Sequence, residues 1–208
     1  MWAPLIAPIG IASAAAGPCP DVEVVFARGT NEPPGVGGIG QAFVDSLRAQ
    51  VHSKSVGVYA VNSPATTDFP TGVDGVIDAS AHVRDMAANC PNTRMVLGGF
   101  SQGAAVMGFV TANVVPDGVV ATDVPNPMPP AVADHVAAVT LFGKPSERFM
   151  RVIGEPPVAI GPLYAAKTTT LCAADDPVCS DGGDWAAHDS YAVDGMVGQA
   201  ASFAASRL

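Results

Sequence analysis

The chain has 208 residues, of which 49% are hydrophobic and 14% charged, and its formal net charge is −9. This composition provides for a large apolar core and excludes an intrinsically disordered chain, and the length corresponds to one domain. The negative charge and the lack of any basic cluster in the sequence argue against nucleic acid as a partner.

The first 16 residues are apolar and end in small residues, with cleavage sites of the A-x-A type after Ala14 or Ala16. We therefore expect a secretory signal segment at 1–16 and a single domain at 17–208. The segment is too short to cross a bilayer, so no integral membrane span is expected. Secretory signals open with Lys or Arg, which this segment lacks, so we expect its start to be truncated or to lie upstream.

Five apolar runs along the chain have the length of strands. They cover residues 22–27, 55–61, 94–98, 136–142 and 167–171. Their apolar character is continuous rather than alternating, except in the more polar last run, and this is typical of parallel strands buried on both faces.

Apolar residues at helical spacing lie between these runs. They are Ile39, Phe43, Leu47 and Val51, then Val76, Val83 and Ala87, then the stretch after Ser101, and finally Val193, Val197, Ala200 and Ala204 in a helix at 190–206. The alternation predicts an α/β fold, a three-layer α/β/α sandwich around a parallel sheet of about five strands. Residues 114–130, rich in Pro, Val and Asp, are expected to form an irregular surface excursion. We interpret it as a tolerated insertion rather than a functional loop.

The most informative motif is Gly-Phe-Ser-Gln-Gly at residues 99–103, because a short apolar strand precedes it and a helical stretch follows. Strand, G-x-S-x-G and helix together form a nucleophile elbow, the turn that presents the catalytic serine in the α/β-hydrolase fold. Small residues are needed at Gly99 and Gly103, where strand and helix pass close together. Ser101 is therefore the candidate nucleophile.

A serine nucleophile needs a histidine base and a carboxylate that orients it, and in this fold the order along the chain is Ser, Asp or Glu, then His. His52 and His82 precede Ser101 and are interpreted as surface positions, and His135 falls at the opposite edge of the sheet. His188 lies in a loop ahead of the last helix, which makes it the candidate base.

The carboxylate is expected between Ser101 and His188, beyond the last strand. Asp175 and Asp176 both lie between Cys172 and Cys179, and spacing alone does not separate them. Asp181 and Asp184 are weaker candidates on a Gly-rich stretch.

The oxyanion hole needs two N–H donors. One is expected from Gln102, directly after the nucleophile, and the other from the loop after the first strand, where Gly29 permits a sharp turn and Thr30 offers an amide and a hydroxyl.

The four cysteines permit three pairings. Cys172 and Cys179 are near enough in sequence to close a small loop, which would leave Cys19 to pair with Cys90. No Cys or His spacing typical of a zinc site occurs in the sequence, so we expect two structural disulfides and an oxidising compartment.

These segments together resemble the cutinase family of small secreted serine esterases, in particular its actinobacterial cutinase-like branch. The resemblance covers about residues 18–208. It is carried by Phe-Ala-Arg-Gly-Thr at 26–30, the serine motif at 99–103, the Cys-x-x-x-Asp-x-x-Cys spacing at 172–179, and His188 before the last helix.

The resemblance implies a small α/β-hydrolase (flavodoxin-like) fold and selects Asp176, four residues after the first cysteine of the pair, as the triad carboxylate. It places the family's oxyanion serine at Thr30 and matches Gln102 to the second donor. It also implies the pairings Cys19–Cys90 and Cys172–Cys179. Neither a metal nor an organic cofactor is implied. Residues 114–130 are longer than is typical of the family.

The implied activity is hydrolysis of short- to medium-chain acyl esters, or of lipid or polyester substrates, through an acyl-enzyme on Ser101. The rims of the acyl groove are expected at 63–72, with Phe69, and at 182–187, with Trp185, and no long amphipathic segment suggests a lid. The alternatives are an acetylxylan esterase, disfavoured by the 6% aromatic content, a thioesterase or phospholipase, an acyltransferase, and a secreted binding protein with an inactive site. A monomer outside the cell, with or without cell-wall association, is expected.

Overall fold

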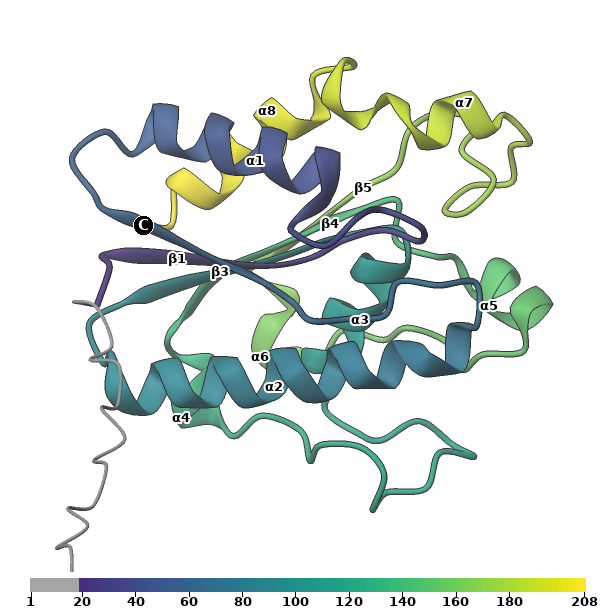
Figure 1. The fold of residues 1–208 in the computed structure, drawn as a ribbon, viewed down its shortest axis with the longest axis horizontal. Coiled ribbons are helices and arrows are strands. Elements are labelled where there is room, and N and C mark those ends of the chain that lie inside the picture. Colours follow the sequence, from purple (N-terminus) through teal and green to yellow (C-terminus); the bar gives the residue numbers. More distant parts are fainter. Residues whose placement is uncertain (1–18) are drawn as a thin grey trace, which may run out of the picture.

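The structure is a computed structural model that describes residues 19–208, so the signal segment predicted at 1–16 lies outside the described residues. Its centre is a five-stranded parallel sheet of order β2-β1-β3-β4-β5 (Figure 1). The strands are β1 (Val22–Ala27), β2 (Val56–Ala60), β3 (Arg94–Phe100), β4 (Val136–Phe142) and β5 (Thr168–Leu171). The sequence-based prediction of an α/β sandwich around a parallel sheet of about five strands is confirmed.

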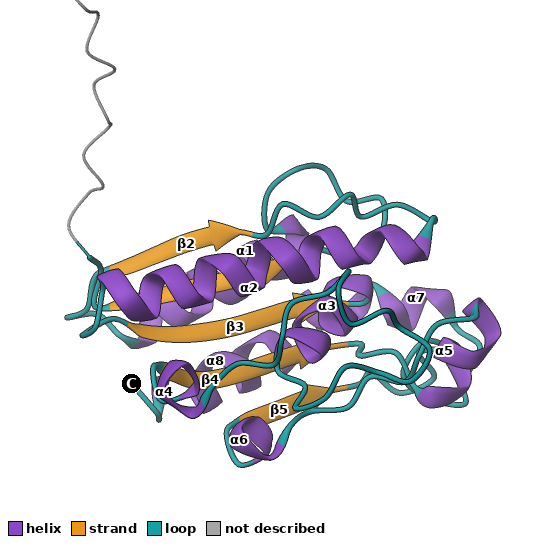
Figure 2. Cartoon of the chain, turned by 90° about the horizontal axis from the view of Figure 1, so that it is seen from below, coloured by secondary structure: helices purple, strands orange, loops and turns teal. Residues whose placement is uncertain are grey.

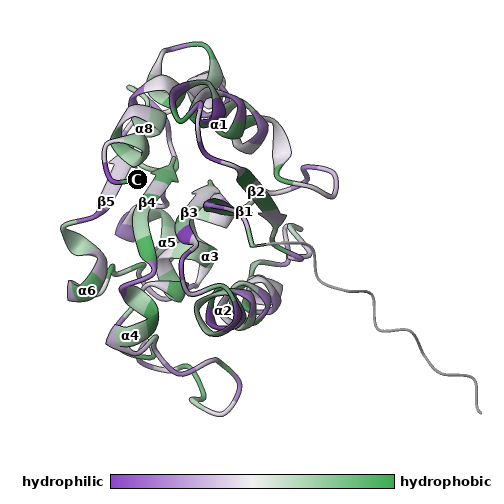
Figure 3. Ribbon diagram, turned by 90° about the vertical axis from the view of Figure 1, so that its left-hand side faces the viewer, coloured by the Kyte–Doolittle hydropathy of each residue, from purple (hydrophilic) through white to green (hydrophobic). Residues whose placement is uncertain are grey.

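Helices cover both faces of the sheet, as Figure 3 shows in a view along the strands. Helices α1 (Gly37–Gln50) and α8 (Met196–Ala205) lie on one face, and α2 (Gly72–Asn89) and α3 (Gln102–Val110) lie on the other. The remaining helices are single turns or short segments: η1 (Phe69–Thr71), α4 (Pro130–Ala133), α5 (Glu147–Ile153), α6 (Pro162–Ala165), α7 (Trp185–His188) and η2 (Ser190–Ala192). Within residues 19–208, no helix has the length and apolar character that a bilayer crossing needs.

The core has one apolar layer on each side of the sheet. Under α1 and α8 it centres on Phe26, Phe43 and Phe142, whose ring centroids lie 5.9 to 6.4 Å apart. The central strands β1 and β4 are buried along their whole length, and β3 is buried from its second residue onward. Because all the strands are parallel, their carboxyl ends meet at one edge of this rigid sheet, where ligands bind in folds of this kind.

The end of the chain differs from the predicted helix at 190–206. A 3₁₀ turn, η2, comes first, and α8 begins only at Met196, after Gly195 with a φ of 88°. That left-handed residue breaks the helical path, so Val193 does not join the apolar face and is 87% exposed. The other three predicted face residues, Val197, Ala200 and Ala204, are buried.

His82, interpreted from the sequence as a surface position, is mostly buried. Its ring stacks on Tyr59 with centroids 3.5 Å apart, and its Nε2 lies 3.1 Å from Oε2 of Glu23. The reason is that Glu23 is a buried carboxylate within β1, and a buried charged group needs a polar partner.

Candidate active site

Ser101 occupies a strained turn between β3 and α3. Its φ of 53° and ψ of −117° are unusual for a residue with a side chain. A Cβ at Gly99 would collide with the carbonyl of Gly103, and a Cβ at Gly103 would collide with the carbonyl of Ala27. Both glycines are therefore required for strand and helix to approach this closely, and the turn holds the serine at the carboxyl edge of the sheet.

Three side chains from separate segments, the turn after β3, the loop after β5 and the end of α7, form a continuous hydrogen-bonded chain. Oγ of Ser101 lies 2.9 Å from Nε2 of His188, and Nδ1 of His188 lies 2.8 Å from Oδ2 of Asp176. Asp176 is fully buried and His188 is 8% exposed. With its Nδ1 proton directed at the carboxylate, the imidazole leaves Nε2 able to accept the serine proton.

The structure separates the four candidate carboxylates. Asp176 alone reaches His188. Asp175 has a φ of 66° and is exposed. Asp181 lies in an exposed ion pair with Arg148. Asp184 accepts a hydrogen bond from the amide of Ala186 and caps α7.

Two further donors fix the Asp176 carboxylate. The amide of Val178 donates to Oδ1 at 2.8 Å, and the hydroxyl of Tyr191 donates to Oδ2 at 2.5 Å. Burial, together with this hydrogen bond, raises the pKa of Tyr191 well above its ordinary value, so the hydroxyl remains a donor at neutral pH. The Cys172–Cys179 disulfide brackets the loop that carries Asp176.

Aromatic rings and one glycine define the position of His188. Phe100 stacks on the imidazole with centroids 4.9 Å apart, and Trp185 meets it edge-on at 5.9 Å. Gly143, at the end of β4, has a φ of 55°, and a Cβ there would lie 3.1 Å from Cε1 of His188. Tyr191 and Gly143 were not predicted from the sequence. A glycine directly after a predicted strand was the available signal for Gly143, whereas nothing in the spacing indicated Tyr191.

The loop after β1, where Thr30 lies, is braced by two charged side chains. Glu32 accepts hydrogen bonds from the amides of Gly29 and Gly38, each at 2.7 Å. Arg28, 7% exposed, donates to the carbonyls of Glu32 and Ser63 at 2.9 and 2.8 Å. These contacts were not foreseen from the sequence. They fix the backbone around the Thr30 amide, and a fixed backbone is what an oxyanion hole requires.

Gln102 begins α3, so its amide is one of the N-terminal groups without a partner inside the helix. Its side chain reaches across to donate to the carbonyl of Thr66 at 2.9 Å. In the same loop, the carbonyl of Ala65 accepts from the amide of Asn31 at 2.7 Å. The loop at 61–68 thereby ties the Thr30 segment to the serine turn. Within residues 19–208, no group of three or more His, Cys, Asp or Glu side chains is arranged to hold a metal ion.

An apolar cavity of about 610 Å³ opens at Ser101 and His188, a size typical of small-molecule sites. Phe69 and Trp185, the aromatic residues expected at the groove rims, both line it. Residues of the 114–130 segment also line it, including Val115, Val119 and Val124. The interpretation of this segment as a merely tolerated insertion is therefore corrected: its apolar side chains form a wall of the cavity. Figure 2 shows the side of the molecule on which α2 and α3 lie, and teal loop segments run past α3 there, between α2 and α5.

The fold and this site define a serine hydrolase of the α/β-hydrolase class. The family model named Cutinase matches residues 18–208, and the chain belongs to the cutinase family.

Three relatives come from Mycobacterium tuberculosis (strain H37Rv). The probable carboxylesterase Culp5 is 66% identical over 166 residues, which are 80% of this chain and 95% of that protein. Carboxylesterase Culp1 is 52% identical over 97% of this chain and 88% of its own length. Phospholipase Culp4 is 52% identical over 98% of this chain and 85% of its own length.

Solved structures agree with the fold. A Trichoderma reesei cutinase in complex with a phosphonate inhibitor superposes with a TM-score of 0.68 at 36% identity, over 90% of this chain and 76% of that one. An acetylxylan esterase superposes with a TM-score of 0.72, over 91% of this chain and 99% of that one, but at 23% identity it is evidence for the fold alone. The protein is a cutinase-like serine ester hydrolase, and its two disulfides, Cys19–Cys90 and Cys172–Cys179, fit an extracellular protein.

Proposed function

We propose that Ser101, His188 and Asp176 form the catalytic triad of a secreted ester hydrolase that cleaves short- to medium-chain acyl esters, or lipid or polyester substrates. The observation that carries the proposal is the unbroken hydrogen-bonded chain from Asp176 through His188 to Ser101, opening on an apolar cavity.

In the proposed mechanism, Oγ of Ser101 attacks the ester carbonyl while Nε2 of His188 takes its proton. Asp176 stabilises the imidazolium, and the backbone amides of Thr30 and Gln102 hold the oxyanion. The imidazolium then protonates the departing alcohol. A water molecule, deprotonated by His188, releases the acid from the acyl-enzyme and restores the serine.

The substrate class follows from the lining of the cavity. Apolar side chains from α2, α3 and the 114–127 segment surround the space beyond Ser101, which favours an acyl chain over a polysaccharide. A phospholipid is a second candidate substrate, because the relative Culp4 is named a phospholipase and matches almost the whole chain. We also infer secretion through a signal at 1–16 and action as a monomer. Cell-wall association after export is consistent with this account.

A series of p-nitrophenyl esters from acetate to palmitate tests this function, with Ser101→Ala as the control. We expect hydrolysis of butyrate to octanoate that the substitution abolishes. Activity confined to acetate would point to an acetyl esterase. Activity that persists in the Ser101→Ala protein, or is absent on every ester, would overturn the proposed function.

A further inference from the structure

The cavity extends far beyond the reacting atoms. It follows α3, whose residues Ala105, Phe109 and Val110 line it along with Ser101. Val110 ends the helix nine residues after Ser101, which corresponds to about 13 Å along the axis at about 1.5 Å per residue. An extended butyryl or octanoyl chain bound to Ser101 would not reach that end, whereas a dodecanoyl chain would.

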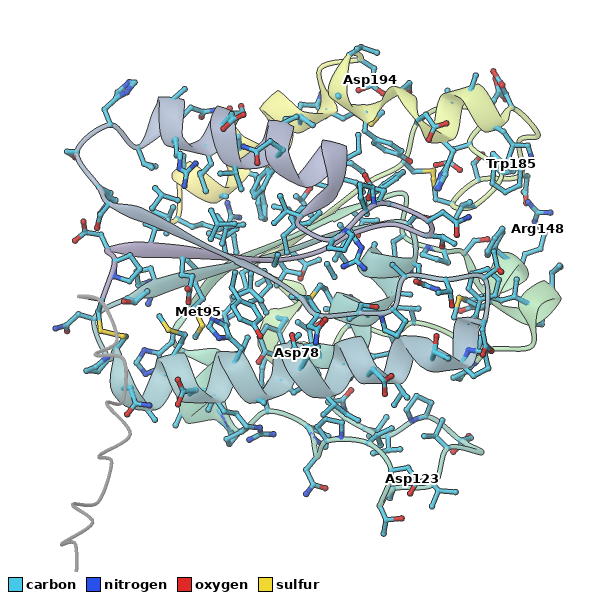
Figure 4. All side chains as sticks on the ribbon, viewed as in Figure 1. Asp78, Met95, Asp123, Arg148, Trp185 and Asp194 are labelled. Carbon is cyan, nitrogen blue, oxygen red and sulfur yellow. A yellow bond between two sulfur atoms is a disulfide. The ribbon has the colours of Figure 1, made fainter. Side chains whose placement is uncertain are left out.

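The distal wall comes from the irregular segment between α3 and α4. Its partly buried residues line the cavity; they are Val115, Pro116, Val119, Val124, Pro125 and Pro127. The residues between them that point away are exposed, among them Asp117, Val120 and Asp123. Asp123 lies at the outer tip of the segment, beyond α2 (Figure 4). The residues of the segment that line the cavity are therefore mainly apolar, with Asn126 as the polar exception, whereas its outer side carries both polar and apolar residues.

The segment is anchored at its two ends. Thr111 is fully buried, and its carbonyl accepts a hydrogen bond from the amide of Gly161 at 2.9 Å. At the other end Met128 is buried, and Arg84 donates to the carbonyl of Asn126 at 2.6 Å. Between these anchors, in the described structure, the backbone hydrogen bonds of residues 113–125 stay within the segment. The middle of the segment can therefore contact a ligand in the cavity through its apolar side chains.

The opposite wall is equally apolar. Val73 and Val76 of α2 and Val106 and Phe109 of α3 line this distal part, and the hydroxyl of Ser80 is its polar exception on α2. A polar ligand such as a sugar would leave most of its hydroxyl groups without partners here, because Ser80 and Asn126 are the polar residues that α2 and the 113–127 segment contribute to the lining. An unbranched hydrocarbon chain would lose only its contact with water.

We propose that residues 113–127 form the distal wall of the acyl-binding site and that the cavity takes the long, unbranched acyl chain of a lipid ester, dodecanoyl or longer. The inference rests on the proposed role of Ser101 as nucleophile and extends its substrates beyond medium chains. Each additional methylene buried along α3 strengthens binding about threefold to fourfold. Val119 is the residue of the wall on which the specificity for long chains is expected to depend.

Two adjacent valines provide a matched test. Val119 is half-buried and lines the cavity, whereas Val120 is 60% exposed and does not. The kcat/KM for p-nitrophenyl butyrate and p-nitrophenyl dodecanoate, below its critical micelle concentration, is measured for Val119→Asp, Val120→Asp and the parent protein. We expect Val119→Asp to lower kcat/KM for dodecanoate about tenfold or more, and for butyrate less than about twofold. Val120→Asp leaves both within about twofold.

Val119→Thr, which keeps the shape of the side chain, repeats the comparison should the aspartate variant fail to fold. Calorimetric binding of dodecanoic acid provides a second readout that needs no turnover, and the same variants are expected to weaken it in the same order. The inference would be overturned if Val119→Asp changed kcat/KM equally for both esters, or for neither ester, and left the binding of dodecanoic acid unchanged. Absence of Ser101-dependent butyrate hydrolysis would instead overturn the proposed function, and the binding measurements would still decide the role of the wall.

Discussion

The hydroxyl of Tyr191 donates a 2.5 Å hydrogen bond to Oδ2 of Asp176, the same oxygen that accepts Nδ1–H of His188. Tyr191 is fully buried, and its hydroxyl also accepts the amide of Ala173 at 3.1 Å. One carboxylate oxygen is thereby fixed by a group that touches neither the cavity nor the serine. In the proposed mechanism, Tyr191 is a positioning residue for the triad.

Tyr191→Phe keeps the ring but removes this donor. We expect kcat to fall about tenfold with KM unchanged, since a hydrogen bond to a charged group contributes about 1.5 to 3 kcal/mol and Tyr191 does not line the cavity. The free energy of unfolding should fall by about 1.5 to 3 kcal/mol. Steady-state kinetics with p-nitrophenyl butyrate and urea unfolding measure the two effects. An unchanged kcat in a destabilised protein would show that the tyrosine acts on folding alone.

Glu32→Gln tests whether Glu32 fixes the loop after β1, which carries Thr30, a proposed donor to the oxyanion. The amide group that replaces one carboxylate oxygen would face a backbone N–H of Gly29 or Gly38, so the loop around Thr30 must shift. We expect kcat to fall about tenfold to a hundredfold, which is less than the roughly hundredfold to thousandfold loss that follows removal of an oxyanion-hole donor itself. Glu147→Gln, at an exposed position on α5, is the matched control and should leave kcat unchanged. Equal kinetics for both variants would contradict the role of Glu32.

The two disulfides are expected to act differently. Cys19–Cys90 joins residues 71 apart in sequence and Cys172–Cys179 residues 7 apart, so loop entropy gives about 4 kcal/mol for the first and about 2 to 3 kcal/mol for the second. Replacing Cys19 and Cys90 by Ala should lower stability more and leave kcat nearly intact. Replacing Cys172 and Cys179 by Ala should lower kcat more, because their loop carries Asp176. Thermal unfolding and kinetics of the two double variants distinguish these effects, and full activity without the short bridge would contradict a clamp on Asp176.

The hydroxyl of Tyr164 is buried and has no hydrogen-bond partner among residues 19–208, and burial raises the pKa of Tyr164 to about 12. Above pH 10 the unfolded chain loses this proton while the folded protein keeps it, so the unfolded state binds fewer protons and stability falls as pH rises. The pKa of Tyr59 and the pKa of Tyr191 are also raised, so these two tyrosines likewise make the folded protein less stable as the pH rises.

Tyr164→Phe should therefore raise the free energy of unfolding by up to about 1 kcal/mol at pH 7, because it removes an unsatisfied buried group. It should also reduce the loss of stability between pH 10 and pH 12. Urea unfolding of both proteins across this range provides the measurement. A variant less stable than the parent at pH 7 would mean that the hydroxyl is satisfied in solution.

The parts of the site that follow from local sequence were predictable. Ser101 was indicated by a turn whose flanking glycines have a steric reason, and His188 by its place ahead of the last helix. Tyr191 and Glu32 were not, because neither a tyrosine near the start of the predicted last helix nor a glutamate in a loop carries a sign of which distant group it will contact. Val193 was misplaced because the effect of Gly195 on the helix depends on its φ, which periodicity does not reveal.

The segment at 114–130 illustrates a different limit. Its valines and prolines have no helical or alternating period, so the pattern predicts only an irregular loop. Which of Val119 and Val120 faces the protein depends on the course of the backbone between its anchors at Thr111 and Met128. Ser101 and this segment are separated in sequence by the whole of α3, so their position at one cavity is evident only in the folded protein.

Covalent labelling tests whether Ser101 is the nucleophile and whether His188 activates it. The protein is treated with a p-nitrophenyl alkylphosphonate, and the modified peptide is identified by mass spectrometry. We expect one adduct per molecule, on Ser101, with none in Ser101→Ala and labelling slowed at least about a hundredfold in His188→Asn, since loss of the base removes the activation of the serine. An adduct on another residue would show that Ser101 is not the nucleophile, and equal labelling without His188 would show that His188 does not activate it.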